Sequence, residues 1–135
     1  MKILAGNERP SRKGPSEWFT GSVWIDEIAV AAEPSRLRAF RVSFEPGART
    51  AWHTHPLGQV LHVLAGSGLV QHEGQPVREI HPGDTVIIAP NERHWHGARS
   101  GSTMVHLALQ EADASNIDVV WLEPVTDQEY AAGRS

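Results

Sequence analysis

The chain has 135 residues, 40% of them hydrophobic, a formal net charge of -4 and no cysteine. This length predicts one domain with a real core, and the lack of cysteine excludes disulfides, thiolate metal sites and cysteine nucleophiles. The slightly acidic charge excludes a basic field for nucleic acid, and Arg36, Arg38 and Arg41 do not keep to one strand face. We therefore expect no nucleic-acid partner.

The N-terminal segment, from Met1 to Asn7, has only three consecutive apolar residues after its lysine. No later stretch is long and apolar enough for a membrane span. These features predict a cytoplasmic protein without a membrane partner. We expect an arm over about residues 1–20 and a barrel over about 21–122, with 1–135 forming a single domain.

Hydrophobic residues alternate along most of the chain and do not follow a helical period. Strand-like stretches occur, in chain order, at residues 23–30, 37–45, 59–65, 69–73, 77–80, 85–89, 93–98 and 102–110. Turn sequences such as Gly66-Ser67-Gly68 separate them. Short strands with a turn about every eight to twelve residues are typical of an all-β sandwich or barrel.

The C-terminal tail is the part of the sequence that has helical signals. Thr126 and Glu129 have the spacing of a capping box, and Gly133 stands where a helix would end. We therefore expect a short helix over about residues 126–132.

Two His-x-His pairs stand in strand-like segments beside Gly/Pro turns. Side chains two apart in a strand point to the same face, so both histidines of a pair can reach one ion. A turn at residues 56–58 lets the chain re-enter the sheet with Gln59 aimed at the same point, and a neighbouring strand brings His94 opposite. The sequence therefore predicts a metal site of three imidazoles and one amide: His53, His55, Gln59 and His94.

The amide of Gln59 determines the expected chemistry of this site. A carboxylate would cancel one unit of the ion's charge, whereas an amide oxygen leaves the full dication. Such a site is more Lewis acidic and lowers the pKa of a coordinated hydroxyl, which favours acid–base chemistry over oxygenase chemistry. Three imidazoles and one oxygen accept manganese, iron, nickel or zinc.

The strand predicted at residues 102–110 has two distinct faces. One face carries Val105, Leu107 and Leu109, and the other carries His106 and Gln110. Buried polar groups need partners, so the polar face is expected to border a wet cavity. By the same parity argument His96 shares a face with His94, whereas His62, His72 and His81 are interpreted as structural.

The centre of the chain resembles the single-domain cupins. Their first motif is Gly, five residues, His-x-His, three or four residues, Glu, six residues, Gly, and residues 47–66 match it with Gln59 in the glutamate position. The second motif is matched loosely by Gly83, Pro90 and His94, with Ala98 where the family has asparagine. The resemblance implies a small double-stranded β-helix, or jelly-roll barrel, that forms a homo-oligomer, a dimer or tetramer.

A narrower resemblance spans nearly the whole chain. Segments 13–21, 44–59 and 94–97 look like those of the bacterial manganese-dependent cupin hydroxynitrile lyases. It implies manganese at His53, His55, Gln59 and His94, with His96, His106 and Gln110 lining the adjoining cavity. It also implies cyanohydrin cleavage in which His106 or His96 takes the hydroxyl proton.

Two other functions use the same predicted ligands. One is a metal-dependent dioxygenase or isomerase acting on a small organic acid, which needs an open redox or chelating site. The other is a non-catalytic cupin that binds a small ligand tightly without turnover.

Overall fold

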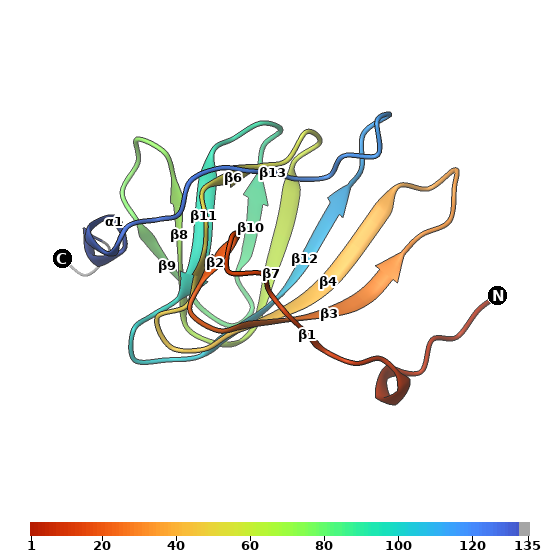
Figure 1. Ribbon diagram of the computed structural model, residues 1–135, viewed down its shortest axis with the longest axis horizontal. Coiled ribbons are helices and arrows are strands. Elements are labelled where there is room, and N and C mark those ends of the chain that lie inside the picture. Colours follow the sequence, from red (N-terminus) through yellow and green to blue (C-terminus); the bar gives the residue numbers. More distant parts are fainter. Residues whose placement is uncertain (133–135) are drawn as a thin grey trace.

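The computed structural model describes residues 1–132 and contains two antiparallel β-sheets and one short C-terminal α-helix. This arrangement confirms the predicted all-β fold. The C-terminal helix lies at one end of the molecule and the N-terminal arm at the other (Figure 1). Among the described residues, no helix is long and apolar enough to cross a membrane.

The first sheet contains the long strands predicted from alternation. In sheet order its strands are β1 (Arg12–Lys13), β3 (Val23–Val30), β4 (Leu37–Phe44), β12 (Met104–Glu111), β7 (Gln59–Gly66) and β10 (Thr85–Ile88). All but β1 were predicted, each within two residues of its bounds. In β12 the side chains alternate between buried and half-buried, which confirms its two predicted faces.

The second sheet is built mostly from short strands. Its main path is β13 (Val120–Trp121), β6 (His53–Thr54), β11 (His94–Ala98), β5 (Arg49–Thr50) and β2 (Phe19–Thr20), and β8 (Gly68–His72) pairs with β11 and with β9 (Arg78–Ile80). The strands β8, β9 and β11 were predicted. The two-residue strands were not, because two residues are too few to show an alternating pattern.

Short helices flank the two sheets. A 3₁₀ helix, η1 (Gly6–Glu8), lies in the N-terminal arm, and α1 (Asp127–Ala131) follows the predicted capping box. Glu129 N donates to Thr126 Oγ1 at 3.1 Å, and Thr126 N donates to Glu129 Oε1 at 2.9 Å, which confirms that box. Gly133, the expected end of the helix, lies outside the described residues.

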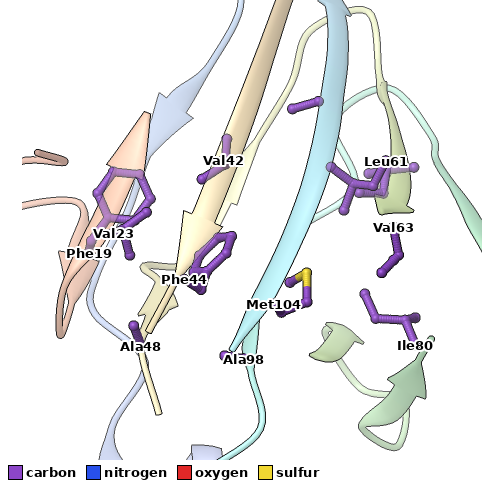
Figure 2. Packing of buried hydrophobic residues seen from close by; sticks show 12 residues of the cluster. Phe19, Val23, Val42, Phe44, Ala48, Leu61, Val63, Ile80, Ala98 and Met104 are labelled. Atoms are coloured by element: carbon purple, nitrogen blue, oxygen red, sulfur yellow. The ribbon is translucent and has the colours of Figure 1, made fainter. Parts of the chain in front are cut away.

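The main hydrophobic core lies between the sheets. Phe44 of β4 and Met104 of β12 are register partners, and Figure 2 shows them next to each other within this core. A second cluster contains Trp52, Trp95 and Tyr130 of α1. The tryptophans beside the histidine motifs therefore fill this core and do not line the main cavity.

A β-bulge interrupts the pairing of β12 with β7 beside the polar face of β12. Val105 pairs with Ala65 and His106 pairs with Val63, so Leu64 is an extra residue in β7. Bulges redirect side chains and are common next to functional sites. Here the bulge lies directly beside His106, whose side chain is fully buried.

Candidate metal centre

Strand pairing brings the two histidine motifs together. In the pairing of β6 with β11, His94 and His53 are direct Cα partners, as expected from the sequence. Their ring centroids are 4.2 Å apart, and the ring of His55 lies 5.0 Å from His53 and 5.4 Å from His94. The three predicted imidazole ligands therefore form one cluster.

A tight turn then positions the predicted amide ligand. Gly58 N donates to His55 O at 3.1 Å, and Gly58 has a φ of +80°, a conformation that favours glycine. A Cβ at Gly58 would also lie 2.6 Å from Ile88 O. The chain therefore turns sharply after His55 and enters β7 at its first residue, Gln59.

Backbone carbonyls orient the three imidazoles. A carbonyl can only accept, so each Nδ1 that meets one carries the proton, and each Nε2 keeps its lone pair for a metal. The three bonds run from His53 Nδ1 to Ala51 O (2.8 Å), from His55 Nδ1 to Asp118 O (2.7 Å) and from His94 Nδ1 to Glu92 O (2.8 Å).

Three of the predicted ligand atoms are buried and lack a hydrogen-bond partner within residues 1–132. They are His55 Nε2, Gln59 Oε1 and His94 Nε2. Buried polar atoms are nearly always satisfied, so such a group of lone-pair donors needs an explanation. A divalent cation would satisfy all of them at once, and the residues present therefore fit a metal ion.

Burial also keeps these imidazoles neutral. It lowers the pKa of His94 to about 4, although the hydrogen bond to Glu92 O acts in the opposite direction. Burial also lowers the pKa of His53 well below its usual value, helped by the neighbouring His94 and His55. Neutral imidazoles are the form that binds a metal, so the site is ready for an ion at neutral pH.

A second pair of imidazoles adjoins this cluster. Among the described residues, ring nitrogens of His53, His94 and His96 lie within 4.8 Å of one another, so His96 borders the predicted ligands. His96 Nδ1 and His106 Nε2 share a hydrogen bond of 3.1 Å. Their other ring nitrogens are buried and have no partner in the described part of the chain.

Gln110 bonds to the predicted amide ligand. Gln59 Nε2 donates to Gln110 Oε1 at 2.8 Å, and Gln110 Nε2 donates to Asp118 Oδ2 at 2.8 Å. Both polar ends of Gln110 are thus engaged by the protein. This bonding suits a role in holding Gln59 more than contact with a substrate.

A cavity of about 180 Å³ opens beside these groups. Six of the seven predicted site residues line it: His53, His55, Gln59, His96, His106 and Gln110. Its remaining wall is mostly apolar and includes Phe19, Ile25, Phe40, Val42, Phe44 and Trp121. Phe40 faces this space and narrows it, so the cavity is suited to a small, partly apolar molecule.

Four further residues at the site were not predicted. The ring of Trp121 lies 4.7 Å from that of His53 and stacks on Trp18 at 5.3 Å. Asp118 and Arg38 form an ion pair at 2.6 Å next to Gln110. Strand parity places Arg38 on the inward face of β4, a signal for a partly buried charge, whereas Asp118 lies in a loop that has no such pattern.

The three histidines interpreted as structural lie away from this cavity. His62 Nδ1 is 2.9 Å from Thr85 Oγ1 on the outer side of the first sheet. His72 Nδ1 lies 3.3 Å from Glu92 Oε1, and His81 Nε2 lies 3.8 Å from Glu79 Oε1. All three contacts are solvent-exposed or partly exposed, which agrees with the sequence interpretation.

Comparisons with known proteins agree with the fold. Residues 40–109 match the family model of the cupin domain. The chain is 53% identical to an (R)-mandelonitrile lyase of Granulicella tundricola over 96% of this chain and 98% of the relative. Its structure is similar to a cupin-like protein of Thermotoga maritima, with a TM-score of 0.82 and 41% identity over 88% of this chain and 90% of the other. A polyketide cyclase of Streptomyces resistomycificus shares the fold at 18% identity, with a TM-score of 0.73 over 100% of this chain and 94% of the other.

Proposed function

The chain belongs to the cupin family, and from this premise we propose that it is a metal-dependent hydroxynitrile lyase. Such an enzyme cleaves a cyanohydrin into an aldehyde and hydrogen cyanide and also catalyses the reverse reaction. The observation that carries the proposal is the buried pair His96 and His106 beside a cluster of neutral metal-ligand donors in one cavity. The similarity to a mandelonitrile lyase supports this substrate class.

We propose that His53, His55, Gln59 and His94 hold one divalent cation, Mn(II), for which Fe(II), Ni(II) and Zn(II) are competitors. Support comes from the buried Nε2 and Oε1 atoms that have no other partner within residues 1–132. When bound, such a cation supplies a Lewis acid that increases the acidity of a substrate hydroxyl and attracts a departing anion.

The histidine pair handles the proton in this proposal. When His96 Nδ1 donates to His106 Nε2, His96 Nε2 keeps a lone pair and accepts the substrate hydroxyl proton. As the carbonyl forms, the bond to the cyano carbon breaks and its electron pair leaves with cyanide. The imidazolium of His96 then protonates cyanide, so hydrogen cyanide and an aldehyde are released and the pair returns to its starting state.

The apolar cavity wall positions the rest of the substrate. Phe40, Val42 and Trp121 line the space beside the histidine pair, and they exclude water from the reacting hydroxyl. A small aryl or alkyl group packs against such a wall through burial of apolar surface. We propose that (R)-mandelonitrile is the preferred enantiomer, as the name of the similar lyase indicates.

The test is benzaldehyde release from mandelonitrile at mildly acidic pH. Chelator-treated protein is compared with the same sample reloaded with Mn(II), and each enantiomer is assayed separately. We expect cleavage only after reloading, and mainly of the R enantiomer. If the protein takes up metal but cleaves mandelonitrile with none of Mn(II), Fe(II), Ni(II) and Zn(II), a small-acid dioxygenase or isomerase, or a ligand-binding cupin, is favoured instead.

We also propose that the chain acts as one domain and associates with further copies of itself. The outer face of the first sheet carries a group of apolar side chains, with Val60, Leu107 and Leu109 half-buried and Ile87 79% exposed. Strand pairing places Ile87 opposite Val60 and Val60 opposite Leu109, so these side chains form one row. A contiguous exposed apolar surface of this kind is typical of a subunit contact.

A further inference from the structure

A chain of three hydrogen bonds connects an arginine near the surface to the predicted amide ligand. Arg38 Nη1 donates to Asp118 Oδ1 at 2.6 Å. Gln110 Nε2 donates to Asp118 Oδ2 at 2.8 Å, and Gln59 Nε2 donates to Gln110 Oε1 at 2.8 Å. The side chains of Arg38 and Asp118 are only 19% and 14% exposed, so solvent screens their ion pair weakly.

The chemistry of the two charged groups determines the direction of every bond in this chain. A guanidinium can only donate and an ionised carboxylate can only accept, whereas each glutamine amide has one donating and one accepting end. The carboxylate of Asp118 therefore requires the NH₂ end of Gln110. The oxygen of Gln110 then requires the NH₂ end of Gln59, which turns Gln59 Oε1 the other way.

The direction of the Gln59 amide matters because a cation binds an amide oxygen and not an amide NH₂ group. Gln59 Oε1 is buried and has no hydrogen-bond partner among the described residues. If the amide were reversed, Gln59 Nε2 would face the cluster of imidazole lone pairs and the incoming ion. One carboxylate, two residues away along the hydrogen-bond chain, thus decides whether Gln59 can act as a ligand.

Asp118 also holds one of the imidazoles. Its backbone carbonyl accepts from His55 Nδ1 at 2.7 Å, which turns His55 Nε2 toward the site. The loop that carries Asp118 is itself held by Arg38, whose Nη2 donates to Asn116 Oδ1 at 2.5 Å. Arg38 therefore fixes both the loop and the carboxylate through one planar group.

We propose that Asp118, held by Arg38, is a positioning residue that makes Gln59 present its oxygen to the metal. This inference rests on the proposed function, because it requires the metal site. It goes beyond that proposal because it assigns the direction of the amide ligand to a residue that does not touch the ion. Its consequence is that the charge of Asp118, and not its volume, controls metal affinity.

The substitution Asp118→Asn tests this, because it removes the charge and keeps the size and the backbone carbonyl. The new amide can direct its NH₂ group at the guanidinium of Arg38, which places two donors against each other. Alternatively, it directs the NH₂ group at Gln110, and the amides of Gln110 and Gln59 then both reverse. We expect the Kd for Mn(II), measured from the electron paramagnetic resonance signal of free Mn(II), to rise about tenfold or more. A role in packing alone predicts a Kd within about twofold of that of the unsubstituted protein.

The matched control is Asp127→Asn. Asp127 also forms an ion pair with an arginine, Arg49, at 2.7 Å, but it lies on α1 and does not line the cavity. We expect the Kd for Mn(II) to stay unchanged in this variant. Thermal unfolding of the metal-free proteins shows whether each variant folds. Should Asp118→Asn fail to fold, Arg38→Met, which removes the group that holds the Asp118 carboxylate and its loop in position, is expected to weaken Mn(II) binding in the same direction.

A double-substitution cycle isolates the route through Gln59. If Asp118 acts through that amide, Asp118→Asn adds less than about twofold to the Kd once Gln59→Ala has removed the ligand. The inference would be overturned if the Kd of the double variant rose by the product of the two single-variant changes, or if the Kd of Asp118→Asn were unchanged. Mn(II) binding without cyanohydrin cleavage would instead contradict only the proposed lyase activity, and a protein that binds none of the four candidate metals would contradict both.

Discussion

His106 Nε2 lies 3.1 Å from His96 Nδ1, and both rings are buried. One ring must donate and the other must accept, so a single proton holds the two imidazoles together. Loss of either ring leaves the other with a buried nitrogen that has lost its partner. The pair therefore works as one unit in the proposed proton transfer, although β11 and β12 contribute one histidine each.

The substitution His106→Ala is expected to lower kcat for mandelonitrile cleavage by about 10²- to 10⁴-fold, the usual contribution of a general acid–base group, because it removes the acceptor that orients His96 for proton transfer. Its bound manganese should stay at the level of the unsubstituted protein, because His106 is not a proposed ligand. His62→Ala is the control, since His62 lies on the outer side of the first sheet. Steady-state rates and metal analysis are measured for both variants. Equal losses of rate in His106→Ala and His62→Ala would contradict the role assigned to His106.

Replacing the amide ligand by a carboxylate, Gln59→Glu, should tighten Mn(II) binding and slow the lyase. A carboxylate cancels one unit of the ion's charge, so the substrate hydroxyl becomes less acidic. It also cannot donate to Gln110 Oε1, which accepts from Gln59 Nε2 in the present structure. We expect kcat to fall about tenfold or more, whereas Gln75→Glu in an exposed turn should leave it unchanged. A faster Gln59→Glu enzyme would contradict the role of the neutral ligand.

The metal-free protein should lose stability as the pH falls from 6.5 toward 4. Burial lowers the pKa of His94 and of His106 from 6.5 to about 4, so below pH 6.5 the unfolded chain takes up protons that the folded state does not. Above pH 6.5 both states are neutral at these residues, and they contribute no pH dependence. Each of the two histidines lowers the free energy of unfolding by roughly 3 kcal/mol once it is protonated in both states.

Urea unfolding of chelator-treated protein at pH 7.5, 6, 5 and 4.5 measures this dependence directly. The substitution His106→Asn should flatten the curve, because one buried imidazole no longer titrates. A free energy of unfolding that stays constant from pH 7.5 to pH 4.5 would show that the imidazoles are hydrated and can be protonated in the folded state.

The outer face of the first sheet should control association between copies. Ile87→Lys together with Leu109→Lys places two charges in the apolar row, and burial of unpaired charges in an interface is costly. We expect the molar mass measured by light scattering to fall to that of one chain. Leu122→Lys is the control, at a 37% exposed leucine that directly follows β13 of the second sheet. An unchanged assembly in the double variant would place the contact elsewhere.

Local periodicity accounts for what could be predicted from the sequence. The alternation of Phe40, Val42 and Phe44 predicted β4, and that of His106 and Gln110 predicted the polar face of β12. Both follow from the two-residue period of a strand, which is a property of the backbone. The same period put His53 and His55 near one point, and the Gly58 turn brought in Gln59. The assignment of these residues as metal ligands stays a prediction.

The parts that could not be predicted depend on contacts across the fold. Residues in β5, β6 and β13 form two-residue strands that are defined by their pairing, since β5 and β6 pair with β11 and β13 pairs with β6. Trp121 reaches His53 in this way, since Trp121 and His53 are register partners between β13 and β6. No local pattern marks such a strand, because its hydrogen-bond partners lie far away in the sequence.

The sequence by itself determined that this chain is an all-β domain with a cluster of histidines and one glutamine, because the alternation of a strand and the residue preferences of a turn depend only on residues close together in the sequence. Only the tertiary structure decided how those side chains are oriented. The carbonyl that orients His55 and the carboxylate that directs Gln59 both belong to Asp118, in a loop after β12. A hydrogen bond requires two groups to meet at about 3 Å in the correct direction, and for residues so far apart in sequence only the folded chain brings them together.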